Sequence, residues 1–397
     1  MPIYGKFSPL MNINRLTPYY VSLFYFIFFA WMGIYIPYFN LYLYHAGMSH
    51  MEIGVITASV PLVRMFSPPL WGYVADRYDR RGLTGRVLWL FSVLIFSLLF
   101  FTKGFYAILL IVVAFTFFWA ATLPIAEDSA VATARARGID YGRMRFWGTI
   151  GFICLVWIMG PVLDRMPVSI VLWGLTVLLL VNFFISFLIP MEKAGNDAPS
   201  LMQALIQIRD RDRFIFLAVS MLMLFSHSAY YAFFSIYLES LDYSKTMIGI
   251  LWGLGPLGEL AVMFYSGPIL KRFGTVSILS FSLLMAALRW AIFASTDQLG
   301  FLIFGQLLHA FTFGTFHVAS MKYIETSFPG NMKNTAQALY NSSSFGTGLV
   351  LGTLVAGYLY EGRGLPFLFL LSSLTALAAA FLLYFMRSPC NCETGKT

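Results

Sequence analysis

Twelve long apolar runs dominate this chain of 397 residues. A run of about 20 apolar residues can cross the roughly 30 Å hydrocarbon core of a bilayer as a helix. Lipid offers no hydrogen-bond partners to the backbone, so only helices and closed barrels span a membrane, and barrel strands alternate over about ten residues. The runs therefore predict transmembrane helices near residues 19–43, 52–75, 86–102, 105–126, 145–163, 168–190, 214–238, 246–269, 275–295, 299–321, 335–359 and 365–386.

The composition agrees with a chain that lies in the membrane throughout. Hydrophobic residues make up 59% of it and charged residues only 11%, whereas charged residues make up about 25% of a soluble domain. The first run follows a polar stretch that has no small-residue cleavage site. We therefore expect it to be retained as a helix and not removed as a signal peptide.

Basic residues alternate between the connections. Of the 26 Lys and Arg residues, 20 fall in the termini and the even-numbered connections, four fall in the odd-numbered connections, and two, Arg64 and Arg289, lie inside spans. Cytoplasmic connections of membrane proteins carry the excess of Lys and Arg, so both termini are predicted to be cytoplasmic. The same bias accounts for the net charge of +8, and nucleic acid is not an expected partner.

The longest polar interruption divides the chain into two sets of six spans. We expect an N-terminal six-helix bundle at residues 1–190, a cytoplasmic central loop at 191–213, and a C-terminal bundle with a short cytoplasmic tail at 214–397. A similar basic loop follows the second span of each half. Basic residues after a span can merely set topology, but recurrence at corresponding places indicates parallel repeats. The loop residues expected to act in conformational gating are Gly72, Asp76, Arg77, Arg80, Arg81, Lys271 and Arg272.

The first of these loops resembles a signature of the major facilitator superfamily. Residues 72–81 follow the pattern Gly-x-x-x-Asp-Arg-x-Gly-Arg-Arg, with Asp79 in place of the second glycine, and the second copy lacks the acidic residue. The resemblance extends over the twelve spans and the central loop. It implies an all-α membrane protein of twelve transmembrane helices in two six-helix pseudo-symmetric bundles. It also implies secondary active transport, with the two loops stabilising one of the alternating states.

Ionisable residues inside the apolar runs point to the site. A charge near the bilayer centre costs about 3 kcal/mol on insertion scales, so it needs a partner, a wet cavity or a function. Glu127 and Arg145 end one span and begin the next, where antiparallel helices can place them face to face. Glu259, Arg289 and His309 come from the eighth, ninth and tenth spans. The alternative is that these residues form ion pairs that only orient the helices.

This constellation is similar to that of the lactose permease group of proton-coupled symporters. Those proteins carry a Glu and an Arg on the fourth and fifth helices for substrate, and a Glu, an Arg and a His on helices eight to ten for coupling. By this resemblance, the substrate pair is Glu127 and Arg145, and the proton-coupling group is Glu259, His309 and Arg289. The symporters have an acid one turn after the histidine, where this chain has Thr312. Glu259 is therefore the first candidate for the proton carrier.

Scattered stretches look closer still to the bacterial phenylpropionate permease branch. They include residues 145–148, 227–231, 251–252 and 288–290, and Arg64 falls at that branch's second-span arginine. The histidines and aromatic residues in these stretches could also have no role in substrate binding. A lone histidine in an apolar helix is usually a packed hydrogen-bonding residue, and single aromatic residues usually face lipid. The residues expected to bind substrate are Arg64, Glu127, Arg145, His227, Tyr230, Tyr231, Trp252 and His317.

Residues 253–258 fit the dinucleotide-binding fingerprint, but the motif works only between a strand and a helix. Inside an apolar run we expect these glycines to serve helix packing or a local break near Gly255-Pro256. The glycines at 346, 348, 352 and 357 in the eleventh span are likewise expected to pack helices closely.

The sequence thus predicts a functionally monomeric transporter of the bacterial inner membrane that imports a small organic solute with protons. An aromatic carboxylic acid such as 3-phenylpropionate is the first expectation, and a sugar or nucleoside symporter is the alternative. Export of amphiphilic compounds is a weaker reading. A membrane enzyme or a sensor is disfavoured because the histidines are dispersed and form no His-x-x-x-His motif. Protons, the solute and membrane lipid are the expected partners, with no cofactor and no metal.

Overall fold

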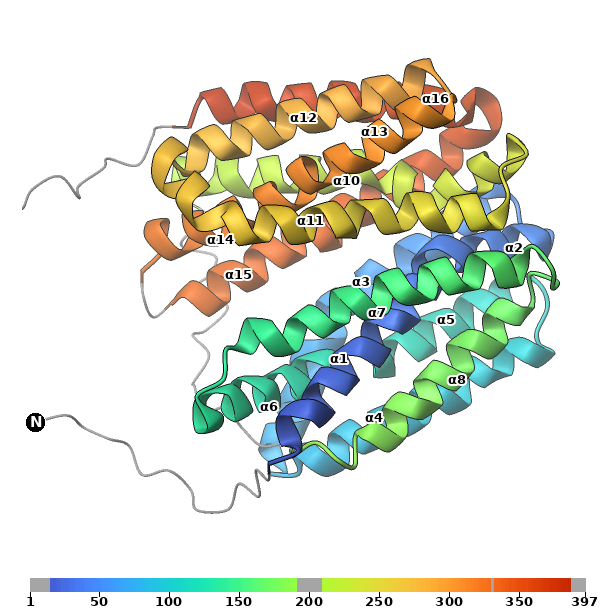
Figure 1. Cartoon of the computed structure of the whole chain (residues 1–397), viewed down its shortest axis with the longest axis vertical. Helices are drawn as coiled ribbons and strands as arrows, with labels where there is room; N and C mark the ends of the chain where they lie inside the picture. The colour runs from blue at the N-terminus through green and yellow to red at the C-terminus, as the bar shows by residue number, and fades with distance from the viewer. Residues whose placement is uncertain (1–14, 191–208, 330–331, 387–397) are drawn as a thin grey trace, which may run out of the picture.

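The computed structural model describes residues 15–190, 209–329 and 332–386, apart from the side chains at 263, 264, 266 and 271. Helices make up most of this part of the chain (Figure 1). Those of the first half are α1 Thr17–Ile34, η1 Tyr35–Phe39, α2 Asn40–His45, α3 His50–Arg77, α4 Arg81–Ser97, η2 Leu98–Phe101, α5 Phe105–Trp119, α6 Thr122–Arg137, α7 Tyr141–Leu163 and α8 Ile170–Ile185. Those of the second half are α10 Arg211–Ser240, α11 Lys245–Phe273, α12 Thr275–Ser295, α13 Leu299–His309, η3 Ala310–Gly314, α14 Thr315–Ser327, α15 Lys333–Asn341, η5 Ser342–Gly348 and α16 Leu349–Tyr384.

These helices supply twelve membrane crossings in the described part of the chain. Nine stretches are long and apolar enough by themselves, and one of them, Lys333–Tyr384, has 52 residues. That stretch turns at Gly364, whose φ of 71° no regular helix adopts, so it crosses twice. The shorter apolar helix α8 and the helix α11 complete the set. The prediction of twelve spans is therefore confirmed.

The fourth span is longer than its apolar run. The sequence predicts an end near residue 126, but α6 continues to Arg137. The polar last turns leave the hydrocarbon, and no Gly or Pro interrupts the helix until Gly138, which takes the left-handed conformation with φ 64°. Hydropathy marks where a span leaves the lipid, whereas the end of the helix depends on the residue that caps it.

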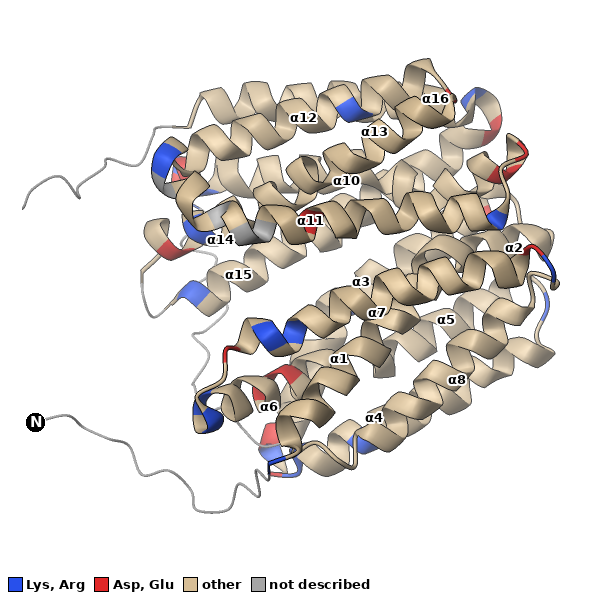
Figure 2. Cartoon of the chain, viewed as in Figure 1, with Lys and Arg blue, Asp and Glu red and all other residues tan. Residues whose placement is uncertain are grey.

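The same packing pattern recurs in the two halves. In the first half α1 packs along α7, and in the second half α10 packs along α16. Between the halves α3 contacts α16 and α7 contacts α11, so the second and eleventh spans pair as the fifth and eighth do. Figure 1 shows the two bundles converging at the end that carries α2. Figure 2 shows Lys and Arg residues mainly at the opposite end, where α1 begins and α16 ends.

Three crossings in the described part of the chain contain a π-helical segment. They are η1 in the first crossing, η3 in the tenth and η5 in the eleventh. In η1, Pro37 lacks the N–H group that a regular helix needs, which favours a local change of pitch. Such single-turn bulges shift the side chains that follow and are frequent at functional sites.

The glycines of the rejected dinucleotide motif pack helices. Helix α11 runs without interruption through Gly255 and Pro256, so the expected break does not occur. A Cβ added to Gly255 would lie 2.8 Å from the His309 ring, and one added to Gly258 would lie 3.1 Å from the Cβ of Ala310. Gly357 similarly lets its helix approach Gly54 of α3. These glycines bring the eighth crossing against the tenth and the eleventh against the second.

The backbone conformation of Asp79 explains why Asp can replace the second glycine of the loop signature. It lies between α3 and α4 with φ 50°, the left-handed region in which glycine is favoured and Asp is tolerated. Gly72, in the same loop, does not mark a close approach of two helices. Among the described residues, none lies within 4 Å of where its Cβ would be.

We expect Asp79→Val to lower the stability of the protein by about 1–2 kcal/mol, because a β-branched residue is strained at positive φ. Asp79→Gly should leave stability unchanged or raise it slightly. Tyr78→Val is the matched control, since Tyr78 is a neighbouring exposed residue with φ −98°. Thermal unfolding of the purified protein in detergent measures all three. Equal losses at both positions would contradict the assignment.

Candidate functional site

Four side chains form a continuous hydrogen-bonded chain inside the second half. The Arg289 guanidinium donates to Nδ1 of His309 at 2.8 Å and to Oε1 of Gln306 at 3.1 Å. Nε2 of His309 lies 2.9 Å from Oε1 of Glu259. The sequence prediction that the eighth, ninth and tenth spans bring these ionisable groups together agrees with this geometry, and Gln306 joins them from one turn before His309.

The geometry determines which ring nitrogen of His309 carries hydrogen. A guanidinium can only donate, so Nδ1 facing Arg289 must be an acceptor. Nε2 therefore carries the hydrogen and donates to the Glu259 carboxylate. The imidazole is neutral in this arrangement and links a fixed cation to a carboxylate without being charged itself. A proton on Nδ1 would disrupt the contact with Arg289.

Arg289 is completely enclosed. Its side chain has 0% exposure, and its guanidinium lies over the rings of Tyr230 at 4.6 Å and Trp290 at 4.4 Å. Phe293 covers it at 5.5 Å. Glu259 is more accessible, with 20% of its side chain exposed, against 8% for His309. The chain of groups thus reaches from a sealed cation to a partly accessible carboxylate.

The other residues predicted in the second half surround this chain. His227 is fully buried, donates through Nδ1 to the Met223 carbonyl at 2.8 Å and meets the Trp290 ring edge-on. Tyr230 donates to Gln306 at 3.1 Å and packs against Trp252.

Two more predicted residues lie nearer the open space. Tyr231 is half-buried beside Trp252. His317 stacks with Phe313, and its Nδ1 has no hydrogen-bond partner among the described residues.

The first half contributes a second, more exposed pair. Arg145 of α7 donates to Glu127 of α6 at 2.9 Å, and the two side chains are 40% and 34% exposed. Tyr141 donates to the same carboxylate at 3.4 Å. The guanidinium also lies over the rings of Tyr25 and Phe29 at 5.5 and 5.1 Å. The two antiparallel helices therefore place Glu127 and Arg145 face to face, as their positions in the sequence predict.

Arg64 is different from both other arginines. It is exposed although it lies midway along α3, and its guanidinium sits 5.7 Å from the ring of Trp119. Within the described residues no carboxylate lies near enough to form an ion pair with it.

The first basic loop forms a small network at the end of the protein where α1 begins and α16 ends. Arg81 donates to Asp76 at 2.7 Å and also pairs with Asp128. Asp128 is 41% exposed and pairs with Arg81 because the start of α4 brings Arg81 to it. Arg77 and Arg80 flank this network at the end of α3 and the start of α4. In the second loop, Arg272 lies over the Phe273 ring, and the side chain of Lys271 lies outside the described part of the chain.

Sequence reasoning missed the residues that join the two halves at the opposite end. Asp164, at the end of α7, accepts hydrogen bonds from the backbone N–H of Lys245 at 2.7 Å and of Thr246 at 3.1 Å. The Thr246 hydroxyl donates to it as well, at 2.5 Å. Asp164 thus caps the first turn of α11, a helix of the other half. Gly160, one turn earlier, allows this approach.

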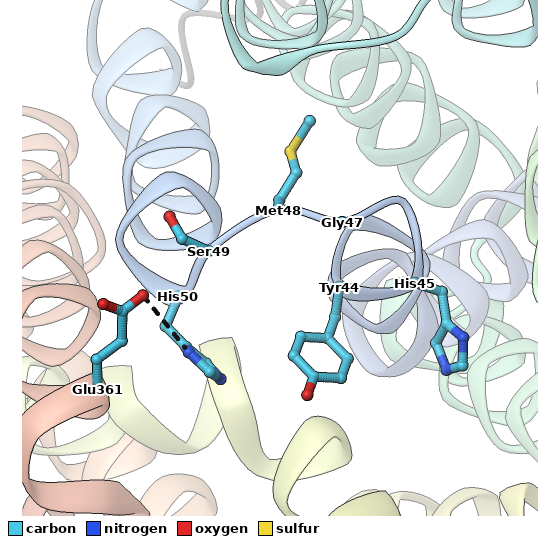
Figure 3. Close-up of a pocket in the computed structure, with 7 residues that line it drawn as sticks. All are labelled: Tyr44, His45, Gly47, Met48, Ser49, His50 and Glu361. Carbon is cyan, nitrogen blue, oxygen red and sulfur yellow. Dashed lines mark ion pairs between the residues drawn. The ribbon is translucent and has the colours of Figure 1, made fainter.

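Two histidines add cross-half contacts at the same end. His45 lies 2.9 Å from Glu239, whose other oxygen accepts from Lys245 at 2.8 Å. His50 stacks on Tyr360 and lies 3.9 Å from Glu361 (Figure 3). A pocket opens between them, lined by residues 44, 45, 47–50 and 361. The available signal was positional, since these residues occupy the ends of the first, second, seventh and eleventh spans.

Asp164 keeps its charge over the physiological range. Slight burial acts to raise the pKa of its carboxyl, but the Thr246 hydroxyl, two backbone N–H groups and the Lys245 charge together hold that pKa below its usual value. A carboxyl whose pKa is lowered by a contact stabilises the state in which that contact is made, here the state with Asp164 bound to α11. This stabilisation is complete above the ordinary pKa of about 3.9, and it is lost only as the pH falls through the lowered pKa. Its cap on α11 is therefore constant between pH 5 and 8.

No group of three or more His, Cys, Asp or Glu side chains comes together as a metal site within the described ranges. The site instead consists of one sealed ionic chain, one half-exposed ion pair and one unpaired arginine.

Known proteins resemble this chain along most of its length. Residues 19–371 match the family described as MFS_1 like family. The chain is 28% identical over 369 residues to an Escherichia coli (strain K12) protein named "Probable 3-phenylpropionic acid transporter", covering 91% of this chain and 96% of that protein. It is 26% identical to the maltose permease of Geobacillus stearothermophilus, covering 91% and 92%. The solved structure of nucleoside transporter NupG has the same fold, with a TM-score of 0.83 at 19% identity over 95% of this chain and 99% of NupG.

We expect Arg289→Met to lower stability by about 3–5 kcal/mol, because it leaves the Glu259 charge without its counter-charge in a low-dielectric interior. Adding Glu259→Gln to Arg289→Met should recover part of this loss. Arg272→Met, at an exposed position, should change stability by less than about 0.5 kcal/mol. Unfolding midpoints in detergent test the cycle. Strictly additive losses would show that Arg289 and Glu259 are not coupled through His309.

Proposed function

Because the chain belongs to the MFS_1 like family of the major facilitator superfamily, we propose that it is a proton-coupled symporter that takes up a small organic solute such as an aromatic carboxylic acid. The acid class is supported by the relative named as a 3-phenylpropionic acid transporter. Proton coupling is supported mainly by the hydrogen-bonded series of side chains that runs from the buried Arg289 through neutral His309 to the partly exposed carboxylate of Glu259.

Glu259 is the group that takes up and releases the proton. Arg289 is a fixed cation, and Nδ1 of His309 is occupied by it. The Glu259 carboxylate keeps a second oxygen, and 20% of its side chain is exposed. Protonation removes its attraction to the distant Arg289 charge, which frees the eighth crossing to move relative to the ninth and tenth. Thr312 stands where the symporters have their acid, so this role falls to Glu259.

Transport follows from alternation between two closed ends. The contacts of Asp164, His45 and His50 hold the two halves together at one end, while the basic loops lie at the other. With the basic end facing the cytoplasm, as the excess of Lys and Arg favours, this conformation is closed to the outside and faces inward. The protein would act as a monomer in the bacterial inner membrane, with both termini cytoplasmic.

Glu127, Arg145, His227, Tyr230, Tyr231, Trp252 and His317 remain the proposed surroundings of the solute. A sugar or nucleoside is the second candidate, favoured by the maltose permease relative and by the fold of NupG. Such solutes would use the same acids and aromatic rings for hydroxyl groups. Competition for uptake among aromatic acids, sugars and nucleosides separates the two classes, and efflux from preloaded vesicles tests export.

Glu259→Gln should abolish uphill uptake of 3-phenylpropionate yet leave exchange across the membrane, because an amide fills the same space but carries no proton. Uptake and counterflow are measured in vesicles with an imposed pH gradient. Glu325→Gln, which alters an exposed pair with Lys322, is the control and should retain both activities. Undiminished proton-driven accumulation in Glu259→Gln would remove Glu259 from the mechanism.

Asp164→Ala should loosen the outer end, because α11 loses the carboxylate that caps its first turn. The readout is labelling of Tyr231→Cys, in a chain otherwise free of cysteine, by a membrane-impermeant maleimide added outside. We expect labelling to be several-fold faster in Asp164→Ala than with Asp164 intact. The ratio of the two labelling rates should be constant from pH 5 to 8, because Asp164 stays charged over that range. Asp297→Ala at the same end is the control. Equal labelling rates would contradict the gate.

A further inference from the structure

Arg64 lies midway along the second crossing, α3. It is 14 residues from the start of α3 and 13 from its end, which places it about 20 Å from either end of the helix. The next residue, Met65, packs against Gly346 of the second half. The guanidinium itself turns toward the ring of Trp119 in α5 and lies within electrostatic range of Tyr35 in η1. Its exposed surface therefore borders the space between the halves and not the lipid.

Arg64 lacks the counter-charge that Arg145 and Arg289 have. Arg145 is paired with Glu127, and Arg289 is linked to Glu259 through His309. Across residues 15–190, 209–329 and 332–386, no carboxylate is in ion-pairing distance of Arg64. An unpaired cation at this depth costs about 3 kcal/mol or more. A bound anion would remove that cost, whereas a neutral sugar or nucleoside would leave it.

Flat aromatic surfaces lie directly beside the guanidinium. The ring of Trp119 is 4.7 Å from that of Trp31, which stacks on Tyr35 at 4.6 Å, and Tyr35 stacks on Phe39 at 4.7 Å. Trp31 and Trp119 are buried, whereas Tyr35 is half-buried and begins the π-helical segment η1. Trp31 and Phe39 cover the two faces of the Tyr35 ring, so Tyr35 offers a partly exposed ring edge next to an available cation.

We propose that Arg64, Tyr35 and Trp119 form the subsite that holds the carboxylate and ring of an aromatic acid. The planar guanidinium has free N–H donors that match a carboxylate in a bidentate contact, and the solute ring packs against the exposed edge of the Tyr35 ring. Arg289 cannot bind the solute carboxylate, because its guanidinium donates to His309 and Gln306 and is covered by three aromatic rings. This inference rests on the proposed transport function and deepens it, because it separates the anion site in the first half from the proton site in the second.

The test compares two probes of nearly equal size, 3-phenylpropionate and its amide, which lacks the negative charge and one acceptor oxygen, by calorimetric titration of the purified full chain. We expect the parent to prefer the acid by about 10- to 100-fold, the range of a charge-assisted contact. Arg64→Gln should reduce this preference below about threefold while binding the amide as the parent does. Arg64→Lys should keep a preference but bind the acid less tightly, because an ammonium lacks the bidentate geometry.

Arg363→Gln is the matched control, since Arg363 also lies over a ring, that of Phe367, but outside the site. Without ligand, Arg64→Gln should raise the unfolding midpoint, because it removes an unpaired charge. A lower midpoint, an equal loss of acid and amide binding, or an unchanged preference would each overturn the subsite.

The experiments can overturn the subsite and the coupling mechanism independently of each other. Lost acid preference in Arg64→Gln together with undiminished accumulation in Glu259→Gln keeps the subsite and overturns proton coupling through Glu259. The reverse pair of results keeps coupling and overturns the subsite. A parent that binds both probes equally overturns the subsite and the acid as substrate.

Discussion

The arrangement of the second half depends on the cost of placing the Arg289 charge in a low-dielectric interior. Three rings cover the guanidinium, and its donors are used by His309 and Gln306. The neutral imidazole then extends the contact to Glu259, so that opposite charges share one network without touching. This requires the tenth crossing to approach the eighth closely. Gly255 and Gly258 allow that approach, and the π-helical segment η3 begins at the residue after His309.

The two halves share a packing pattern but differ in how they treat charge. In the second half the cation is sealed, and only the carboxylate at the end of the chain reaches open space. In the first half the Glu127–Arg145 pair is half-exposed and Arg64 is unpaired. A sealed network favours a proton, which needs only one accessible carboxylate. An exposed cation beside stacked rings favours a larger anionic solute. In the proposed mechanism, this asymmetry separates the proton site in the second half from the solute site in the first.

The contacts that join the two halves at the end that carries α2 are of a kind that can form and break. Asp164 caps a helix of the opposite half, and a carboxylate at a helix N-terminus satisfies backbone N–H groups that otherwise face water. When the halves separate, water can replace it at small net cost. The histidine–glutamate contacts and the approach at Gly160 belong to the same surface. Separation of the ends therefore need not disturb the packing within either half.

The sequence by itself determined the membrane class, the twelve crossings, the repeated halves and the family. Length and polarity of a run suffice for a crossing because lipid excludes unpaired backbone groups. It also singled out the ionisable residues, since a charge in an apolar run is visible without a structure. Only the tertiary structure decided which of them are partners. Arg64 and Arg289 look alike in sequence, yet one is exposed and the other enclosed, because exposure depends on neighbouring helices. The same holds for Asp164, Asp128 and Asp79, whose roles arise from a helix of the other half, a neighbouring helix end and a backbone angle. None of these is encoded by spacing along one helix.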